Sequence, residues 1–366
     1  MRGWHTRLAL LVAIGLVWFG VFEAALRIYG GSEAAPAFQQ LFMQDPAVGH
    51  RLRPGASTRF TTSEFSVTIA INAQGVRDDE PIGPKPAGER RVVVLGDSIA
   101  LAVQVDADKT FCHLLEQRLN ARSDGTRYRV INGGVQGYGP MEEVRFYETV
   151  AAQFDPDLVL ITTFVANDAV EALDRSWRLD ASRPAAVEAQ AEAERRLRRI
   201  VRRSMVLQIV NQRIEQVSER LRPAQQPLPD RRLLSYATPL REDIARGFEQ
   251  AARAAQRIAT AAATGGARTG LVLVPARFQL DDADFQRIRG GVTRAGFTID
   301  PQAASQRFEQ AYRPLGLPIL DLLTPFQASL DPLGIFFQHT VHLTPTGHAV
   351  AAEALGQFID ANALLP

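Results

Sequence analysis

Arg91-Val-Val-Val-Leu-Gly-Asp-Ser98 joins an uninterrupted apolar run to a glycine and two polar residues. A run of this kind is typical of a strand that is buried on both faces, because a strand with one wet face would alternate. Four similar runs follow, separated by stretches with helical periodicity: Tyr128-Arg-Val-Ile131, Leu158–Phe164, Leu271–Val274 and Pro318-Ile-Leu320. Strands that alternate with helices in this way predict a three-layer α/β/α domain around a five-stranded parallel sheet.

The composition is that of a globular protein without a strong overall charge. The 366 residues are 46% hydrophobic and include 41 basic and 40 acidic side chains, for a net charge of +1. A chain this close to neutrality has no overall electrostatic footprint for nucleic acid, so we expect no nucleic-acid partner. The single cysteine, Cys112, excludes an intramolecular disulfide and a zinc site built from cysteines.

In the first thirty residues, basic side chains precede a long uncharged run, as in membrane-targeting segments. Arg2 and Arg7 precede an uncharged run from Leu8 to Phe22, and Arg27 follows it. We expect a signal-anchor transmembrane helix over residues 1–30, with a cleaved signal peptide as the alternative. The basic residues before the run place the N-terminus in the cytoplasm. The protein would then be a single-pass protein of the bacterial inner membrane, with its body extracytoplasmic (periplasmic).

The rest of the chain divides into an extension and a main domain. Residues 31–89 predict a linker and a β-rich extension, because the run Phe65–Ile71 alternates and glycines and prolines surround it. Residues 90–366 predict the α/β domain, with a helical insertion at about 169–267. Within the insertion, apolar residues between Leu197 and Leu221 recur every three or four positions beside a cluster of arginines. They predict an amphipathic helix that packs on the core, touches anionic lipid, or serves as a lid or partner helix.

Two loops after predicted strands carry candidate chemistry. Ser98 follows the first strand, and the carboxyl ends of parallel strands are where such sheets bind ligands. It is either a nucleophile or an ordinary turn residue. The second loop, Asn132-Gly-Gly-Val-Gln-Gly-Tyr-Gly139, exposes backbone N–H groups to a phosphate or to a developing oxyanion. Its spacing is not that of a dinucleotide-binding loop, so we expect no cofactor.

Two further loops supply an amide and a histidine. Asn167 ends the third strand, where its side-chain amide can donate to the same oxyanion. His342 precedes a helix that Thr344 caps and Pro345 begins, so it stands where a general base can be held rigidly. We expect no metal among the nearby histidines, because no carboxylate pattern accompanies them. A second helix of the insertion, Leu240–Ala263, ends at two glycines.

These four blocks, in this order, resemble the GDSL/SGNH hydrolase family over about residues 90–360. The stretch Ile71–Asp78 also resembles membrane-anchored bacterial members. The resemblance implies a flavodoxin-like sheet in which Ser98 attacks an ester carbonyl. It implies an oxyanion hole made by the N–H groups of Ser98 and Gly137 and the amide of Asn167. His342 would accept the proton of the serine.

The sequence departs from the family at two places. Val165 stands where the family usually has glycine, and we expect its bulk to narrow the site. The aspartate of the triad would precede the histidine by three residues or two, where this chain has His339 and Thr340. Neither residue has a carboxylate. In a triad, the carboxylate of the aspartate fixes the tautomer of the imidazole. Asp331 and Asp321 are candidates to replace it.

Together these features predict an extracytoplasmic serine esterase that forms an acyl-enzyme on Ser98. The expected substrate is an ester or acetylated glycan of the cell envelope or of an exopolysaccharide. Two alternatives remain: an O-acyltransferase that uses the same site, and a catalytically silent protein of the same fold that binds glycan or an envelope partner. The missing carboxylate favours the silent protein, and the four intact site residues favour the enzyme. The sequence identifies no protein partner.

Overall fold

The computed structural model describes residues 2–29, 38–122, 125–175, 204, 206–207, 230–294 and 296–365. The chain divides into two compact units, which are treated separately: residues 1–33 with 181–226, and residues 34–180 with 227–366. Apart from residues 204, 206 and 207, the amphipathic helix expected between Leu197 and Leu221 lies outside the described residues.

In the first unit, helix α1 spans Arg2–Tyr29. Within the part of the chain that the structure describes, no helix is both long enough and apolar enough to cross a membrane. The helix expected at residues 1–30 is therefore present, but its prediction as a transmembrane segment is not supported.

The second unit contains the predicted five-stranded sheet. Its strands are β5 (Glu89–Gly96), β6 (Arg127–Gly134), β7 (Leu158–Phe164), β9 (Arg268–Val274) and β11 (Ile319–Asp321). They lie in the order β11-β9-β7-β5-β6, and every pair is parallel. This confirms the parallel sheet. The first strand in the chain lies between the second and the third, so the order reverses between β5 and β7, as in flavodoxin-like sheets.

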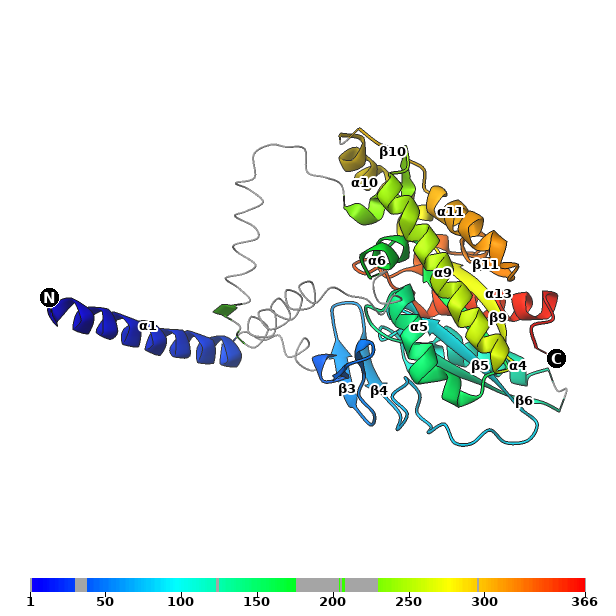
Figure 1. Ribbon diagram of the computed structural model, residues 1–366, viewed down its shortest axis with the longest axis horizontal. Helices are drawn as coiled ribbons and strands as arrows, with labels where there is room; N and C mark the ends of the chain where they lie inside the picture. Colours follow the sequence, from blue (N-terminus) through cyan, green and yellow to red (C-terminus); the bar gives the residue numbers. More distant parts are fainter. Residues whose placement is uncertain are drawn as a thin grey trace. The chain divides into compact units, whose positions relative to one another are not determined.

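Helices cover both faces of this sheet (Figure 1). Because successive side chains of a strand point to opposite faces, β5 directs Val93 and Leu95 into one apolar core and Val92 and Val94 into the other. The first core is covered by α5 (Pro140–Thr149), α6 (Asp168–Arg175), α9 (Glu242–Thr264) and α11 (Ala303–Tyr312). The second is covered by α4 (Phe111–Asn120), α12 (Leu323–Gln327) and α13 (Pro345–Ala361).

Capping residues decide where several helices begin and end. Thr110 accepts a hydrogen bond from the His113 N–H at 3.3 Å, so α4 begins at Phe111, after a short 3₁₀ turn. The N-cap expected at Thr344 is confirmed, and α13 begins at Pro345. Helix α10 (Asp282–Arg294) and the short strand pair β8 (Ala237–Thr238) and β10 (Thr298–Ile299) are not predicted by the sequence.

The β-rich extension forms two antiparallel hairpins. One pairs β1 (Phe42–Asp45) with β2 (Gly49–Leu52), and the other pairs β3 (Ser57–Thr61) with β4 (Ser66–Ala70). Leu52, Val67 and Ile69 are almost completely buried and belong to the first core. The hairpins are therefore packed into the same core as the sheet.

Candidate active site

Ser98 and Asn167 follow the two strands between which the sheet order reverses. Ser98 begins the short helix α3 (Ser98–Leu101) directly after β5, and Asn167 follows the end of β7. The Thr162 hydroxyl donates to the Leu95 carbonyl at 2.7 Å and joins the two strand ends. In open parallel sheets a ligand binds at the carboxyl ends of the strands at this reversal point. The two residues thus flank the position where the fold places a ligand.

Helix α3, which presents Ser98, is held at both ends by buried side chains. At its start, Asp97 Oδ1 accepts from the Ile99 N–H at 2.8 Å, and burial raises the pKa of Asp97 to about 6. At its end, the guanidinium of Arg77 donates to the carbonyl oxygens of Leu101 at 2.9 Å, Ala102, and Val105 at 2.5 Å. The half-buried Ser98 hydroxyl has no hydrogen-bond partner among the described residues.

The loop of Gly137 needs glycine at two positions. Gly137 has a φ of +74°, which side-chain-bearing residues rarely adopt, and a Cβ on Gly134 would lie 2.3 Å from the Leu101 nitrogen. Arg175 Nη1 donates to the Gly137 carbonyl at 2.9 Å, and His50 Nε2 lies 2.8 Å from the Gln136 carbonyl on the other side. Within the described part of the chain, the backbone N–H groups of Ser98 and Gly137 donate to no acceptor.

The Asn167 side chain is oriented by the helix that follows it. Its Nδ2 donates to Glu171 Oε1 at 3.2 Å, and the side chain also hydrogen-bonds the Asp97 carboxylate, so a bound oxyanion would have to compete with these carboxylates for the amide. Asp168 Oδ2 accepts from the Phe164 N–H at 2.8 Å and closes the turn that carries Asn167. Val165 is completely buried in the first core. Its side chain is thus part of the core, contrary to the expectation that it narrows the site.

Three buried or partly buried acidic side chains, Glu143, Asp168 and Glu171, influence one another's charge close to Asn167. The sequence does not predict this group. Burial raises the pKa of Glu171 to about 7 and that of Glu143 and Asp168 well above the ordinary carboxyl value. Repulsion from the neighbouring carboxylates raises the pKa values of these groups further. Arg175 pairs with Glu142 at 3.0 Å and with Glu171 at 3.5 Å. The group is therefore partly protonated near neutral pH and held together by a guanidinium.

His342 lies in a narrow loop between Phe336 and Leu343, which form a bridge. The Phe337 N–H donates to the His342 carbonyl at 3.0 Å. Both ring nitrogens are buried and have no hydrogen-bond partner among the residues described, so the structure contains no Ser98–His342 hydrogen bond. Burial lowers the pKa of His342 to about 4, so the ring is neutral at pH 7 and able to accept a proton. Leu343 and Ile99, the chain neighbours of His342 and Ser98, belong to the same core.

Neither Asp331 nor Asp321 replaces the triad aspartate in this structure. Asp331 Oδ1 accepts from the Gly334 N–H at 3.0 Å and caps a 3₁₀ turn, while Asp321 Oδ1 accepts from the Leu323 N–H at 2.8 Å. Neither carboxylate is bonded to His342. His348 also has a structural role, because its Nδ1 lies 3.3 Å from the Phe111 nitrogen and joins α13 to α4.

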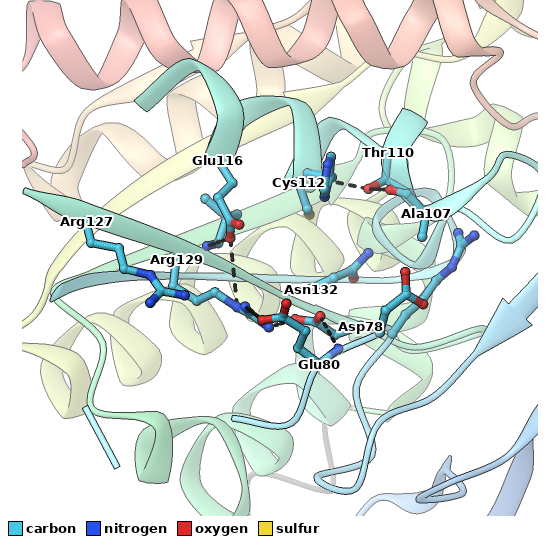
Figure 2. A pocket seen from close by; sticks show the side chains of 13 residues that line it. Asp78, Glu80, Ala107, Thr110, Cys112, Glu116, Arg127, Arg129 and Asn132 are labelled. Atoms are coloured by element: carbon cyan, nitrogen blue, oxygen red, sulfur yellow. Dashed lines mark hydrogen bonds and ion pairs between the residues drawn. The ribbon is translucent and has the colours of Figure 1, made fainter. Parts of the chain in front are cut away.

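Figure 2 shows a polar pocket at the outer edge of the sheet, beside β6. Arg129 donates to Asp78 at 2.7 Å and to Glu80 at 2.8 Å, and it also faces Glu116. The charges in this pocket therefore largely pair with one another and hold residues 78–80 against the edge strand. None of Ser98, Gly137, Asn167 and His342 lines it.

Comparisons with known proteins place the chain in a family. The family model described as GDSL-like lipase/acylhydrolase matches residues 92–355. No match is found among curated proteins. Similar solved structures include TesA (15% identity, TM-score 0.41), which covers 75% of this chain and 100% of its own. The lipase/acylhydrolase from Enterococcus faecalis has 12% identity and a TM-score of 0.41, with 75% and 96% covered. An acetylxylan esterase mutant from Geobacillus stearothermophilus has 12% identity and a TM-score of 0.40, with 74% and 94% covered.

These structural likenesses are too remote to identify a substrate. The family match does identify the family, because it spans most of the chain. It includes the loops that carry Ser98, Gly137, Asn167 and His342. The chain belongs to the GDSL-like lipase/acylhydrolase family.

Proposed function

We propose that this protein is a serine ester hydrolase that forms an acyl-enzyme on Ser98. The observation that carries the proposal is the pair of backbone N–H groups at Ser98 and Gly137. Both lack an acceptor among the described residues, and they belong to loops that follow the neighbouring strands β5 and β6, while Asn167 follows β7 on the other side of β5. Donors held in place in this way stabilise the negative charge that develops on an ester carbonyl oxygen.

The reaction follows from the chemistry of these groups. The Ser98 oxygen attacks the ester carbonyl carbon, and its proton passes to the neutral His342 ring. The carbonyl oxygen becomes an oxyanion that accepts from the N–H groups of Ser98 and Gly137 and from the Asn167 amide. Collapse of this intermediate breaks the ester bond, and the leaving alcohol takes the proton from His342. Water then repeats the sequence and releases the acid.

The Ser98–His342 hydrogen bond needed for this reaction is absent from the structure. Catalytic hydrogen bonds often tighten only when substrate is bound, so the present geometry is compatible with the proposal. The test is hydrolysis of p-nitrophenyl acetate by the wild-type protein, Ser98→Ala and His342→Ala. We expect turnover in the wild type and its loss in both variants. Turnover that survives in Ser98→Ala would rule out the proposed nucleophile.

One observation favours the silent alternative: both nitrogens of His342 lack a partner among the residues that the structure describes, and no carboxylate stands at residues 339 and 340. A folded wild-type protein that neither hydrolyses esters nor reacts with a serine-directed fluorophosphonate would support this alternative. Acyl transfer is distinguished by the acceptor. A sugar added to the assay becomes acylated if the protein is an O-acyltransferase and stays unmodified if water is the acceptor.

The substrate and the location form a separate part of the proposal. We propose an extracytoplasmic location and an ester of the cell envelope or of an exopolysaccharide as substrate. The order of Arg2, Arg7 and the uncharged run that follows supports export. Fractionation of cells expressing the full chain tests the location, and release of acetate from acetylated polysaccharides tests the substrate. Protein found only in the cytoplasm would contradict the location.

A further inference from the structure

The loop that carries His342 is held from outside by the hairpin of β3 and β4. Glu64 lies in the turn between these strands and accepts from the Gln338 N–H through Oε1 at 2.7 Å. Its Oε2 accepts from the His339 N–H at 3.1 Å. The ring of Phe65, the next residue, contacts the ring of Phe337 with centroids 5.5 Å apart. The hairpin turn therefore packs on the three residues at the start of this loop.

A guanidinium holds the same peptide groups from the other side. Arg277, which follows β9, donates to the carbonyl oxygen of Phe337 at 3.3 Å and to that of Gln338. The Phe337 carbonyl and the Gln338 N–H belong to one peptide group, and the Gln338 carbonyl and the His339 N–H belong to the next. A trans peptide directs its C=O and N–H to opposite sides. In each of these two successive peptide groups, Arg277 therefore binds the carbonyl oxygen and Glu64 binds the N–H group.

Charged partners make these hydrogen bonds stronger than neutral ones. Arg277 is itself fixed by Asp284, a nearly buried carboxylate. The two held peptides lie at the position where the family has its triad aspartate, and His342 follows three residues after His339. A loop that lacks the aspartate is in this way given a rigid backbone by side chains from two other parts of the chain.

We propose that Glu64 is a positioning residue for His342 and compensates for the missing carboxylate by fixing the loop backbone. This inference rests on the proposed function. Glu64 does not bond the imidazole in this structure, so it acts through the loop and not on the substrate. The extension that supplies it is then part of the catalytic apparatus, and its removal would release the histidine loop.

Glu64→Gln tests the proposal with an isosteric change that removes the negative charge and one acceptor oxygen. Glu80→Gln is the control, because Glu80 belongs to the same extension and its carboxylate likewise bonds other parts of the chain, here Arg129, away from the site. We expect kcat to fall by about tenfold to a hundredfold in Glu64→Gln, the range that a small displacement of a catalytic group produces. KM and the melting temperature should remain near those of the wild type and of Glu80→Gln.

A purely structural role is distinguished by rescue. His339→Asp returns a carboxylate to the family position, and we expect it to recover kcat in the Glu64→Gln background. Its gain in the wild-type background should be smaller, because Glu64 lies beside residue 339 and repels the new charge. A kcat of Glu64→Gln equal to that of Glu80→Gln, or a loss that His339→Asp does not recover, would overturn the proposal.

Hydrogen exchange tests the positioning role of Glu64 independently of the proposed esterase activity. The amide hydrogens of residues 338 and 339 should exchange faster in Glu64→Gln than in wild type, whether or not the protein is an esterase. Wild-type protein without turnover defeats the proposed function. Unchanged exchange at these two amides defeats the role of Glu64, even in an active enzyme.

Discussion

Arg175 donates to the carbonyl oxygen of Gly137 at 2.9 Å, so the helix that follows Asn167 holds the loop of Gly137. The same guanidinium pairs with Glu142 and Glu171. One side chain therefore joins the loops that carry the two proposed oxyanion donors, Gly137 and Asn167, to nearby carboxylates. The oxyanion site proposed above would depend on this contact.

Removal of Arg175 should impair both catalysis and stability, because it releases the Gly137 loop and leaves the Glu142 and Glu171 carboxylates unpaired. For Arg175→Gln we expect kcat to fall by about tenfold or more, because the Gly137 loop loses its fixed position. Arg231→Gln is the control, since Arg231 is an exposed arginine that pairs with Asp174 at 3.0 Å. Steady-state kinetics of both variants make the comparison. Equal kcat values for the two would contradict the role of Arg175.

Asn167→Ala tests the oxyanion donor directly. Loss of one such donor lowers kcat by about 10²–10³, since the interaction forms only in the transition state, and KM should change little. The surface variant Asn362→Ala should keep wild-type kcat. A rise in KM with an unchanged kcat would mean that Asn167 binds substrate without stabilising the oxyanion.

The activity should persist into acid solution. Burial lowers the pKa of His342 to about 4, so the ring stays neutral, and available as a base, until the pH falls to that range. We expect the acid limb of the kcat/KM profile to lie near pH 4, below the ordinary histidine value of about 6.5. A profile of kcat/KM between pH 3.5 and 8 decides this. An inflection at the ordinary histidine value would show that the loop exposes the ring in solution.

The buried carboxyl groups should make the folded protein less stable as the pH rises. The pKa values of Glu143, Asp168 and Glu171 are raised, so the folded state binds more protons than the unfolded state between about pH 5 and 8. The free energy of unfolding then falls as the pH rises through this window. Thermal unfolding at several pH values checks the direction.

Glu143→Gln provides the matching variant. Its Oε1 is buried and has no partner in the described part of the chain, so a neutral amide removes an unfavourable charge at high pH. We expect Glu143→Gln to be more stable than wild type at pH 8, by an amount on the order of 1 kcal/mol, and less dependent on pH. Below about pH 6.5 the buried histidines, whose pKa values are lowered, contribute in the opposite sense, so the test is made between about pH 7 and 8. A wild-type melting temperature that rises with pH in that range would contradict this account.

The sheet and the loops at its edge were predictable because their signals are local. Val92–Leu95 is a continuous apolar run, and Leu158–Phe164 is apolar except for two threonines, so both can be recognised as strands buried on both faces without knowledge of their neighbours. Ser98 and Asn167 follow those runs directly, so their place at the sheet edge follows from the chain order alone. Thr344 and Pro345 likewise mark the start of α13 through short-range capping.

The residues that surround and position the candidate site could not be predicted in the same way. Glu64 and Gln338 are 274 residues apart, and a glutamate in a hairpin turn has no sequence pattern that identifies its partner. Glu143 occupies the first turn of α5, where an acidic residue is ordinary, and only the packing of α5 shows that it is buried. Such residues depend on tertiary contacts, which a single sequence does not show.

The most direct test of the central claim is covalent labelling of Ser98. The wild-type protein is treated with a fluorophosphonate, digested, and analysed by mass spectrometry, with Ser98→Ala treated in parallel. The account predicts one adduct on the peptide that contains Ser98 and none in the variant. An adduct on another serine, or a folded wild-type protein that takes up no label, would contradict it.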